Sequence, residues 1–95
     1  MKTQKLMVTI YSKPGCHLCD EAKAEILGAR CRSEFELREI NIETDQDLYE
    51  LYKNEIPVIF IGERKAFKYR LTSSEFCERL RRHKKKKEHE EHEDF

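Results

Sequence analysis

The residues best suited to chemistry in this chain are Cys16 and Cys19, which stand in a C-x-x-C spacing. An apolar, strand-like run leads into them and a helical pattern leads out, so Cys16 is predicted at the N-terminus of a helix. The first N–H groups of a helix lack internal partners and carry the positive end of its dipole, which favours ionisation of a thiol there. Cys19 follows on the same helix face, within reach of a disulfide. The pair therefore indicates thiol–disulfide exchange.

Two simpler explanations of the Cys16 and Cys19 spacing remain open. A structural zinc site normally needs a second pair of ligands, whereas the remaining cysteines, Cys31 and Cys77, are far apart in the sequence. The pair could also be two inert core thiols that happen to be near each other. Cys31 and Cys77 are predicted to be a loop thiol and a core thiol that need no function. No metal site is predicted.

The size and charge of the chain limit its organisation. Its 95 residues suffice for one small domain, and its formal net charge of zero predicts no broad attraction to nucleic acids or membranes. The apolar run near the N-terminus is too short for a signal peptide or a membrane span. We therefore expect a reducing compartment, the cytoplasm with mitochondria left open, where a C-x-x-C pair is usually catalytic or metal-binding and not structural. We expect one domain over residues 1–83 and a charged, disordered tail over 84–95.

Hydrophobic spacing and turn residues predict an alternating order of strands and helices. Strands are expected at 6–11, 35–41, 57–61 and 66–70, with a hairpin turn at 62–65. Helices are expected at about 16–29, at 46–54, and from a capping box at Thr72–Glu75 to about Leu80. The first strand, the first helix and the second strand fit a right-handed βαβ unit with parallel strands.

With C-x-x-C opening the first helix and Ile-Pro opening the third strand, the chain resembles the glutaredoxin branch of the thioredoxin fold. More narrowly, it resembles the short glutaredoxin-like proteins with a Y-S-K-P-x-C-x-L-C-type site. The resemblance extends over about residues 6–80 and rests on Ser12–Cys19, Asn41, Ile42, Tyr52, Ile56–Val58 and Gly62. It implies an α/β fold of order β-α-β-α-β-β-α, with a four-stranded mixed sheet of spatial order 2-1-3-4 and helices on both faces.

The resemblance also implies roles for the residues around the pair. Cys16 is the nucleophile that forms a mixed disulfide, and Cys19 resolves it and leaves a Cys16–Cys19 disulfide. Lys13 adds positive charge near the thiolate or meets a substrate carboxylate, and a protonated His17 stabilises the thiolate. The Ile56–Pro57 peptide is expected to be cis, so that the Ile56 backbone binds the substrate like an added strand.

Two classes of function follow for this chain. The first is a dithiol oxidoreductase that acts as a monomer on a disulfide-containing protein or a glutathione mixed disulfide, with no resident cofactor and glutathione as the candidate co-substrate. The chain lacks the Gly-Gly and Ser/Asp segment that holds the γ-glutamyl end of glutathione in ordinary glutaredoxins, and His17 and Leu18 depart from their motif. Weak turnover with glutathione is therefore expected. The second class is a thioredoxin-fold binding module whose cysteines are redox-inert or bind a metal.

Overall fold

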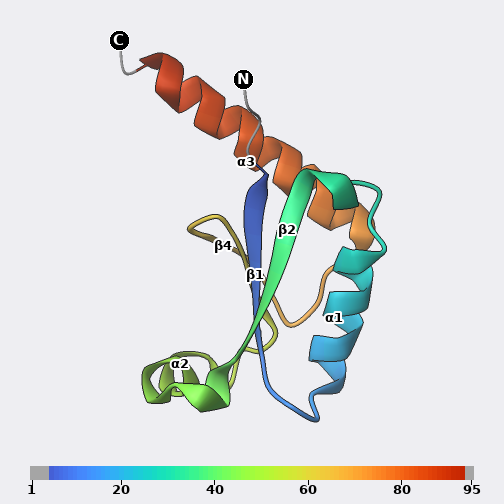
Figure 1. Cartoon of the computed structure of the whole chain (residues 1–95), viewed down its shortest axis with the longest axis vertical. Coiled ribbons are helices and arrows are strands. Elements are labelled where there is room, and N and C mark those ends of the chain that lie inside the picture. The colour runs from blue at the N-terminus through green and yellow to red at the C-terminus, as the bar shows by residue number, and fades with distance from the viewer. Residues whose placement is uncertain (1–4, 94–95) are drawn as a thin grey trace.

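The computed structural model describes the backbone of residues 5–93 and the side chains of residues 5–84. Strands and helices alternate along the chain, with two short 3₁₀ helices, η1 and η2, between them (Figure 1). The elements are β1 (Leu6–Ser12), α1 (His17–Leu27), η1 (Arg32–Glu34), β2 (Phe35–Asn41), η2 (Ile42–Thr44), α2 (Gln46–Tyr52), β3 (Val58–Ile61), β4 (Arg64–Lys68) and α3 (Ser73–Glu93). The predicted order β-α-β-α-β-β-α is confirmed.

The four strands form one mixed sheet in the order β2-β1-β3-β4. β1 and β2 run parallel and are connected through α1, whereas β3 is antiparallel to β1 and to β4. This confirms the predicted spatial order 2-1-3-4 and the predicted βαβ unit. Tyr11 pairs with Val58 and Ser12 pairs with Asn41, so the ends of β1 and β2 and the start of β3 lie together.

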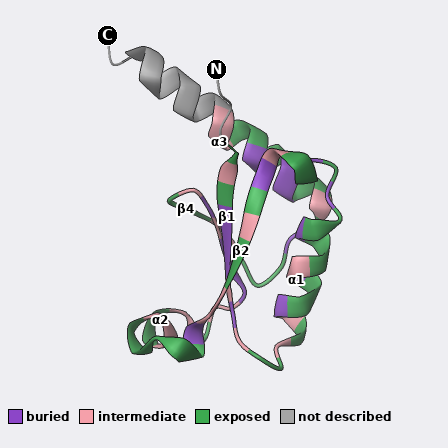
Figure 2. Cartoon of the chain, viewed as in Figure 1, coloured by how far each residue is buried: buried purple, intermediate pink, exposed green. Residues whose placement is uncertain are grey.

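The main core lies between the sheet and the helices α1 and α3. Alternate residues of β1, Val8 and Ile10, are fully buried in one cluster with Ile26 of α1 and Phe76 of α3. Figure 2 shows buried residues along β1 and on the sides of α1 and α3 that face the sheet. Each large apolar side chain contributes about 1.5–3 kcal/mol by leaving water. This packing fixes the position of α1, and therefore of the cysteines at its start.

Helix α2 covers the opposite face of the sheet through aromatic contacts. Tyr11 of β1 stacks on Tyr52 of α2 with ring centroids 5.0 Å apart, and it meets Phe60 of β3 edge-on at 5.6 Å. Helix α2 has no buried residue, and its ribbon in Figure 2 is coloured mostly as exposed. Helices therefore lie on both faces of the sheet, as the resemblance implies (Figure 1).

The hairpin between β3 and β4 is tighter than the sequence predicts. Ile61 pairs with Arg64, so Gly62 and Glu63 alone form the turn. Gly62 adopts a φ of 62°, which side chains with a Cβ disfavour, and this permits the short connection. The sequence predicts a turn over the polar residues up to Lys65. An exposed edge strand can also be rich in charged residues, so composition alone does not distinguish it from a turn. β4 therefore begins at Arg64 instead of residue 66.

Helix α3 is longer than the sequence predicts. The sequence predicts a disordered tail from residue 84, whereas α3 continues to Glu93. Lysine and glutamate dominate this stretch, and their high helix propensity favours continuation of the helix. Among the described residues, no helix is both long enough and apolar enough to cross a membrane.

Cys31 and Cys77 form a disulfide, which corrects the prediction of two separate thiols. Their Cα atoms lie 5.8 Å apart, within the usual range for disulfides, and both side chains are buried. Cys31 follows α1 and Cys77 lies near the start of α3, and the Cys31 N–H also donates to Cys77 Sγ over 3.3 Å. The two positions are 46 residues apart, so only the packing of α3 against the turn after α1 brings them together.

Candidate functional site

The loop between β1 and α1 presents Cys16 at the start of the helix. Gly15 has a φ of 80°, a conformation that glycine adopts easily, and this lets the chain reverse direction just before Cys16. Cys16 is the N-cap residue of α1, with φ −93° and ψ 107°. Its Sγ accepts a hydrogen bond from the Cys19 N–H over 3.1 Å, and its carbonyl accepts one from the Asp20 N–H over 3.1 Å. The predicted position of Cys16 at a helix N-terminus is therefore confirmed.

Cys16 and Cys19 form the second disulfide of the structure, and their environments differ. Their Cα atoms lie 5.2 Å apart. Cys16 is only half-buried, whereas Cys19 is 2% exposed and lies beneath it in the first turn of α1. A partner from solution can therefore reach Cys16 and not Cys19. This difference in exposure suits a pair in which one thiol contacts the substrate and the other is buried behind it.

Lys13 and His17 lie on either side of Cys16 along the chain. Lys13 is half-buried in the turn that precedes α1, and His17 is exposed as the first residue of the helix. Asp20 supplies a negative charge in the same helical turn. The local charge around Cys16 is therefore mixed, and the helix N-terminus adds its own partial positive charge.

Ile56 and Pro57 lie next to the end of β1, and the peptide between them is cis. The pairing of Tyr11 with Val58 places Pro57 beside Ser12, at the edge of the sheet from which the Cys16 loop leaves. Pro57 is buried, and its carbonyl accepts the Tyr69 N–H over 2.8 Å. Outside the helices and strands of the described residues, no hydrogen bond uses the Ile56 backbone. Its polar groups therefore remain open to an added peptide strand.

A charged network beneath the loop was missed by the sequence analysis. Ser12 Oγ donates to Glu39 Oε2 over 2.9 Å, and Lys23 Nζ lies 2.8 Å from Glu39 Oε1. The hydrogen bond from Lys23 holds the pKa of Glu39 below its ordinary value, and Glu39 in turn raises the pKa of Lys23. The network joins the end of β1 to β2 and α1. It depends on the parallel register of two strands, which spacing along the chain does not reveal.

A groove of about 610 Å³ extends from the cysteine loop toward the start of α3. Leu18, which stands between His17 and Cys19, lines one end of the groove. Its other walls come from α1, from the segment that joins β4 to α3 and from the first turn of α3; these residues are Glu21, Ala22, Ala24, Glu25, Tyr69, Arg70, Leu71, Thr72 and Glu75. The groove is therefore continuous with the site, and its walls include three carboxylates.

The polar groups at the start of α3 are engaged within the protein. Thr72 and Glu75 form the predicted capping box, since the Thr72 N–H donates to Glu75 Oε1 and the Glu75 N–H to Thr72 Oγ1, both over 3.1 Å. The Ser73 N–H donates to Glu25 Oε1 over 2.7 Å, and Ser73 Oγ donates to the Glu25 carbonyl over 2.7 Å. These donors are therefore already satisfied.

Metal-ligating side chains do not gather in the part of the chain that the structure describes. No group of three or more histidine, cysteine, aspartate or glutamate residues stands there in an arrangement that could hold an ion. The histidines at positions 89 and 92 fall outside the described side chains.

Comparison with known proteins agrees with this geometry. The model of the glutaredoxin-like domain (DUF836) matches residues 7–88. A protein of Dictyostelium discoideum named glutaredoxin-like protein YDR286C homolog is 30% identical over 99 residues, which cover 95% of this chain and 92% of that protein.

Solved structures share the fold. The solution structure of protein Ne2328 from Nitrosomonas europaea has a TM-score of 0.69 and 30% sequence identity, and the match covers 84% of this chain and 96% of that one. The crystal structure of protein XcR50 from X. campestris has a TM-score of 0.64 with 23% identity, covering 77% of this chain and 93% of that one. With the family model matching most of its length, this chain belongs to the glutaredoxin-like domain (DUF836) family.

Proposed function

We propose that the protein is a dithiol thiol–disulfide oxidoreductase that uses Cys16 and Cys19. The observation that carries this proposal is the asymmetry of the pair: Cys16 is the accessible N-cap of α1, and Cys19 is buried one helical turn further on. A thiol at a helix N-terminus ionises more readily than a free thiol, and the thiolate is the attacking species. An inert core pair would have no reason to expose one partner at this position.

The exchange proceeds in two displacements. The reduced Cys16 thiolate attacks one sulfur of a substrate disulfide, forms a mixed disulfide and releases the other substrate sulfur as a thiolate, which takes a proton from water. Cys19 then gives up its proton and attacks Cys16 Sγ, which releases the second substrate thiol. The substrate gains two electrons and two protons, and the protein is left with the Cys16–Cys19 disulfide. A low-molecular-weight thiol or a second dithiol protein must reduce it again.

The surroundings of Cys16 suit an extended peptide as substrate. The open backbone groups of Ile56 offer one donor and one acceptor, as an edge strand would. Lys13 can meet a carboxylate of the peptide, and His17 can stabilise the thiolate when protonated. We therefore propose disulfide-containing proteins as the main substrates, with a role in thiol homeostasis, and no nucleic acid or membrane partner.

Glutathione is proposed to be a poor substrate because the donors at the start of α3 are engaged. The N–H groups of Thr72 and Ser73 and the Ser73 hydroxyl donate to Glu75 and Glu25, so these donors are not available to the γ-glutamyl carboxylate. Loss of hydrogen bonds to a charged group costs about 1.5–3 kcal/mol each, or roughly ten- to a hundredfold in affinity. We expect slow turnover in a glutathione-coupled deglutathionylation assay, compared with a glutaredoxin that has the Gly-Gly and Ser/Asp segment.

The proposal is tested by trapping substrates on Cys19→Ser, in which the mixed disulfide on Cys16 cannot be resolved. Cys16→Ser is the matched control, because it keeps the same number of thiols but removes the nucleophile. Mass spectrometry should find protein adducts on Cys16 of the first variant and none on Cys19 of the second. If Cys16 and Cys19 form neither adducts nor a disulfide with each other under any mild oxidant, the binding-module class is favoured instead.

A further inference from the structure

Tyr69 directly follows β4 and has a backbone conformation that is unfavourable for a residue with a side chain. Its φ is 71°, whereas the other described residues with a positive φ, Gly15 and Gly62, are glycines. Such conformations are destabilising, and they cluster at functional sites, where surrounding contacts maintain them. Tyr69 is 43% exposed, so burial in the core does not hold it there. Contacts outside the core must therefore favour this conformation.

Those contacts hold both sides of the loop that presents Ile56. The Tyr69 N–H donates to the Pro57 carbonyl over 2.8 Å, and the Tyr69 hydroxyl donates to the Asn54 carbonyl over 3.2 Å. One bond lies just after Ile56 in the chain and the other lies two residues before it. The backbone groups of Ile56, which are open to an added strand, therefore lie between two points that a single tyrosine fixes.

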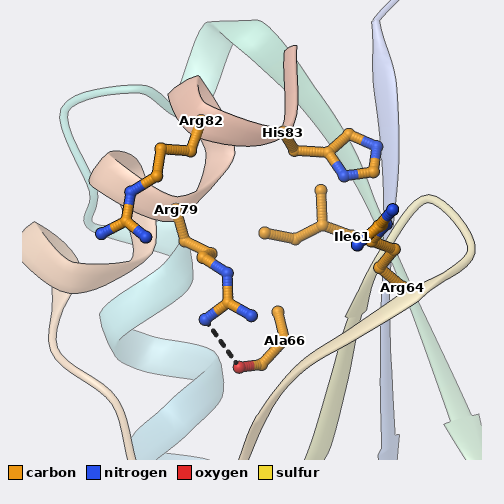
Figure 3. Close-up of a pocket in the computed structure, with 6 residues that line it drawn as sticks. All are labelled: Ile61, Arg64, Ala66, Arg79, Arg82 and His83. Atoms are coloured by element: carbon orange, nitrogen blue, oxygen red, sulfur yellow. Dashed lines mark hydrogen bonds between the residues drawn. The ribbon is translucent and has the colours of Figure 1, made fainter. Parts of the chain in front are cut away.

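The strand that leads into Tyr69 is itself anchored to the core. Arg79 of α3 donates from Nη1 to the Ala66 carbonyl of β4 over 3.2 Å (Figure 3). The Arg79 guanidinium also lies over the Phe67 ring, 5.6 Å from its centroid. Phe67 packs against Phe76 of the core, with ring centroids 6.4 Å apart. Tyr69 therefore extends from a fixed strand, which allows it to brace the neighbouring loop.

Tyr69 also lines the groove beside the cysteine pair, together with Leu18 of the C-x-x-C motif. It therefore contacts both parts of the surface on which an extended peptide would lie. We propose that Tyr69 is a positioning residue for disulfide exchange, which holds the Ile56 backbone as a docking edge for the main chain of an extended peptide. This inference rests on the oxidoreductase function proposed above, and it assigns the preference for peptide substrates to one side chain.

The test compares two disulfides that share one half and differ in the other. One is hydroxyethyl disulfide, and the other is an extended peptide whose single cysteine forms a disulfide with mercaptoethanol. The reduced full chain is mixed with each probe in a single turnover. The protein dithiol becomes the Cys16–Cys19 disulfide, and the two sulfurs of the probe leave as thiols. Alkylation and peptide mapping at successive times give the rate constant for each probe.

Variants of Tyr69 should change only the reaction with the peptide. Tyr69→Phe removes the hydroxyl alone and should lower the rate constant for the peptide probe by about threefold or more, with that for hydroxyethyl disulfide unchanged. Tyr69→Gly also removes the ring, although glycine adopts this φ easily, and should lower the peptide rate constant further. Tyr49→Phe is the matched control, because the Tyr49 hydroxyl makes no hydrogen bond among the described residues and lies on α2.

The outcomes separate this inference from the proposed function. If the parent chain reacts with neither probe, the oxidoreductase function is wrong and the positioning role is wrong with it. If the parent chain reacts with both probes but Tyr69→Phe slows neither or slows both equally, only the positioning role is overturned, since a merely structural effect would not depend on the probe. Melting temperatures of the variants are compared, and Tyr69→Phe decides where Tyr69→Gly is less stable.

Discussion

The two disulfides of this small domain use the same chemical group in opposite ways. Cys16 and Cys19 are three residues apart at the start of a helix, and Cys16 is half-buried and more accessible than Cys19. Cys31 and Cys77 are 46 residues apart, are both buried, and join the turn after α1 to α3. Access and a helix N-terminus suit the first pair to the exchange proposed above, whereas burial and long separation suit the second pair to a structural crosslink. The comparison teaches that position in the fold, more than the presence of a disulfide, decides what a cysteine pair does.

The largest expected difference between the pairs is in activity. Cys16→Ser should reduce disulfide exchange on a protein substrate to the uncatalysed background, because no other accessible thiolate occupies that position. The double variant Cys31→Ala and Cys77→Ala should keep its rate within about threefold, since distant sites act nearly independently. An insulin-type disulfide reduction assay measures both. Loss of activity in the double variant, once its folding is verified, would mean that the second pair takes part in the exchange.

The second disulfide should contribute more to the stability of the protein than the first, which is the reverse of their order in activity. In the chain-entropy model, closing the 46-residue span between Cys31 and Cys77 is worth about 4 kcal/mol. The same model gives only about 2 kcal/mol for the three-residue span between Cys16 and Cys19. Urea unfolding with and without reductant measures each contribution separately, first in a chain with Cys16 and Cys19 replaced by serine and then in one with Cys31 and Cys77 replaced by alanine. A larger effect of reductant in the second chain would reverse the ranking.

The sequence predicted the position and the pairing of Cys16 and Cys19 well because the pattern that places them is local. A strand, a Pro-Gly turn, a C-x-x-C spacing and a helical pattern are all contained in about fifteen residues, and each follows from short-range preferences. The second pair depends on how α3 packs against the turn after α1, which no spacing along the chain encodes. The hydrogen-bond network of Ser12, Lys23 and Glu39 was not predicted for the same reason, because it forms only once β1, β2 and α1 are packed together.

The remaining differences between sequence and structure arise at exposed boundaries. The start of β4 and the end of α3 both fall in charged stretches, where no apolar pattern marks a strand or a helix. A polar turn and a solvated edge strand have similar compositions, and a charged helix resembles a charged tail. The order of elements was predictable because strands and helices carry clear apolar runs and periodicities, whereas the sheet topology was predicted from the resemblance to the glutaredoxin branch of the thioredoxin fold.

In the fully reduced protein, the alkylation rates of the cysteines should differ, but by a smaller factor than the loss of activity expected for Cys16→Ser. Cys16 should react with iodoacetamide about tenfold or more faster than Cys31 and Cys77 near neutral pH, because it is accessible and lies at a helix N-terminus. Peptide mapping of the labelled chain at a series of times and pH values gives the rate at each cysteine. Rates at Cys16 and Cys19 that rise together near the pH typical of a free thiol would contradict the proposed activation.

The smallest expected effect concerns how the loop of the first pair is supported. Unlike the core-packed crosslink, this loop rests on a partly exposed ion pair, with side-chain exposures of 42% for Lys23 and 39% for Glu39. The Lys23 hydrogen bond lowers the pKa of Glu39 from its ordinary value of 4.5. The ion pair therefore contributes fully to the free energy of unfolding above pH 4.5. This contribution is lost as the pH falls through the lower pKa that Glu39 has in the folded state.

Glu39→Gln should accordingly lower the free energy of unfolding by about 0.5 kcal/mol at neutral pH, a value limited by solvent screening. The difference from the parent chain should disappear in strong acid, where both states carry a neutral side chain at this position. Glu36→Gln is the matched control, because Glu36 is exposed on the same strand and outside the network. Urea unfolding of the oxidised chains at neutral and at acid pH provides the measurement. If both variants behave alike at neutral pH, the ion pair does not support the loop, and the first pair is positioned by the apolar packing of α1 alone.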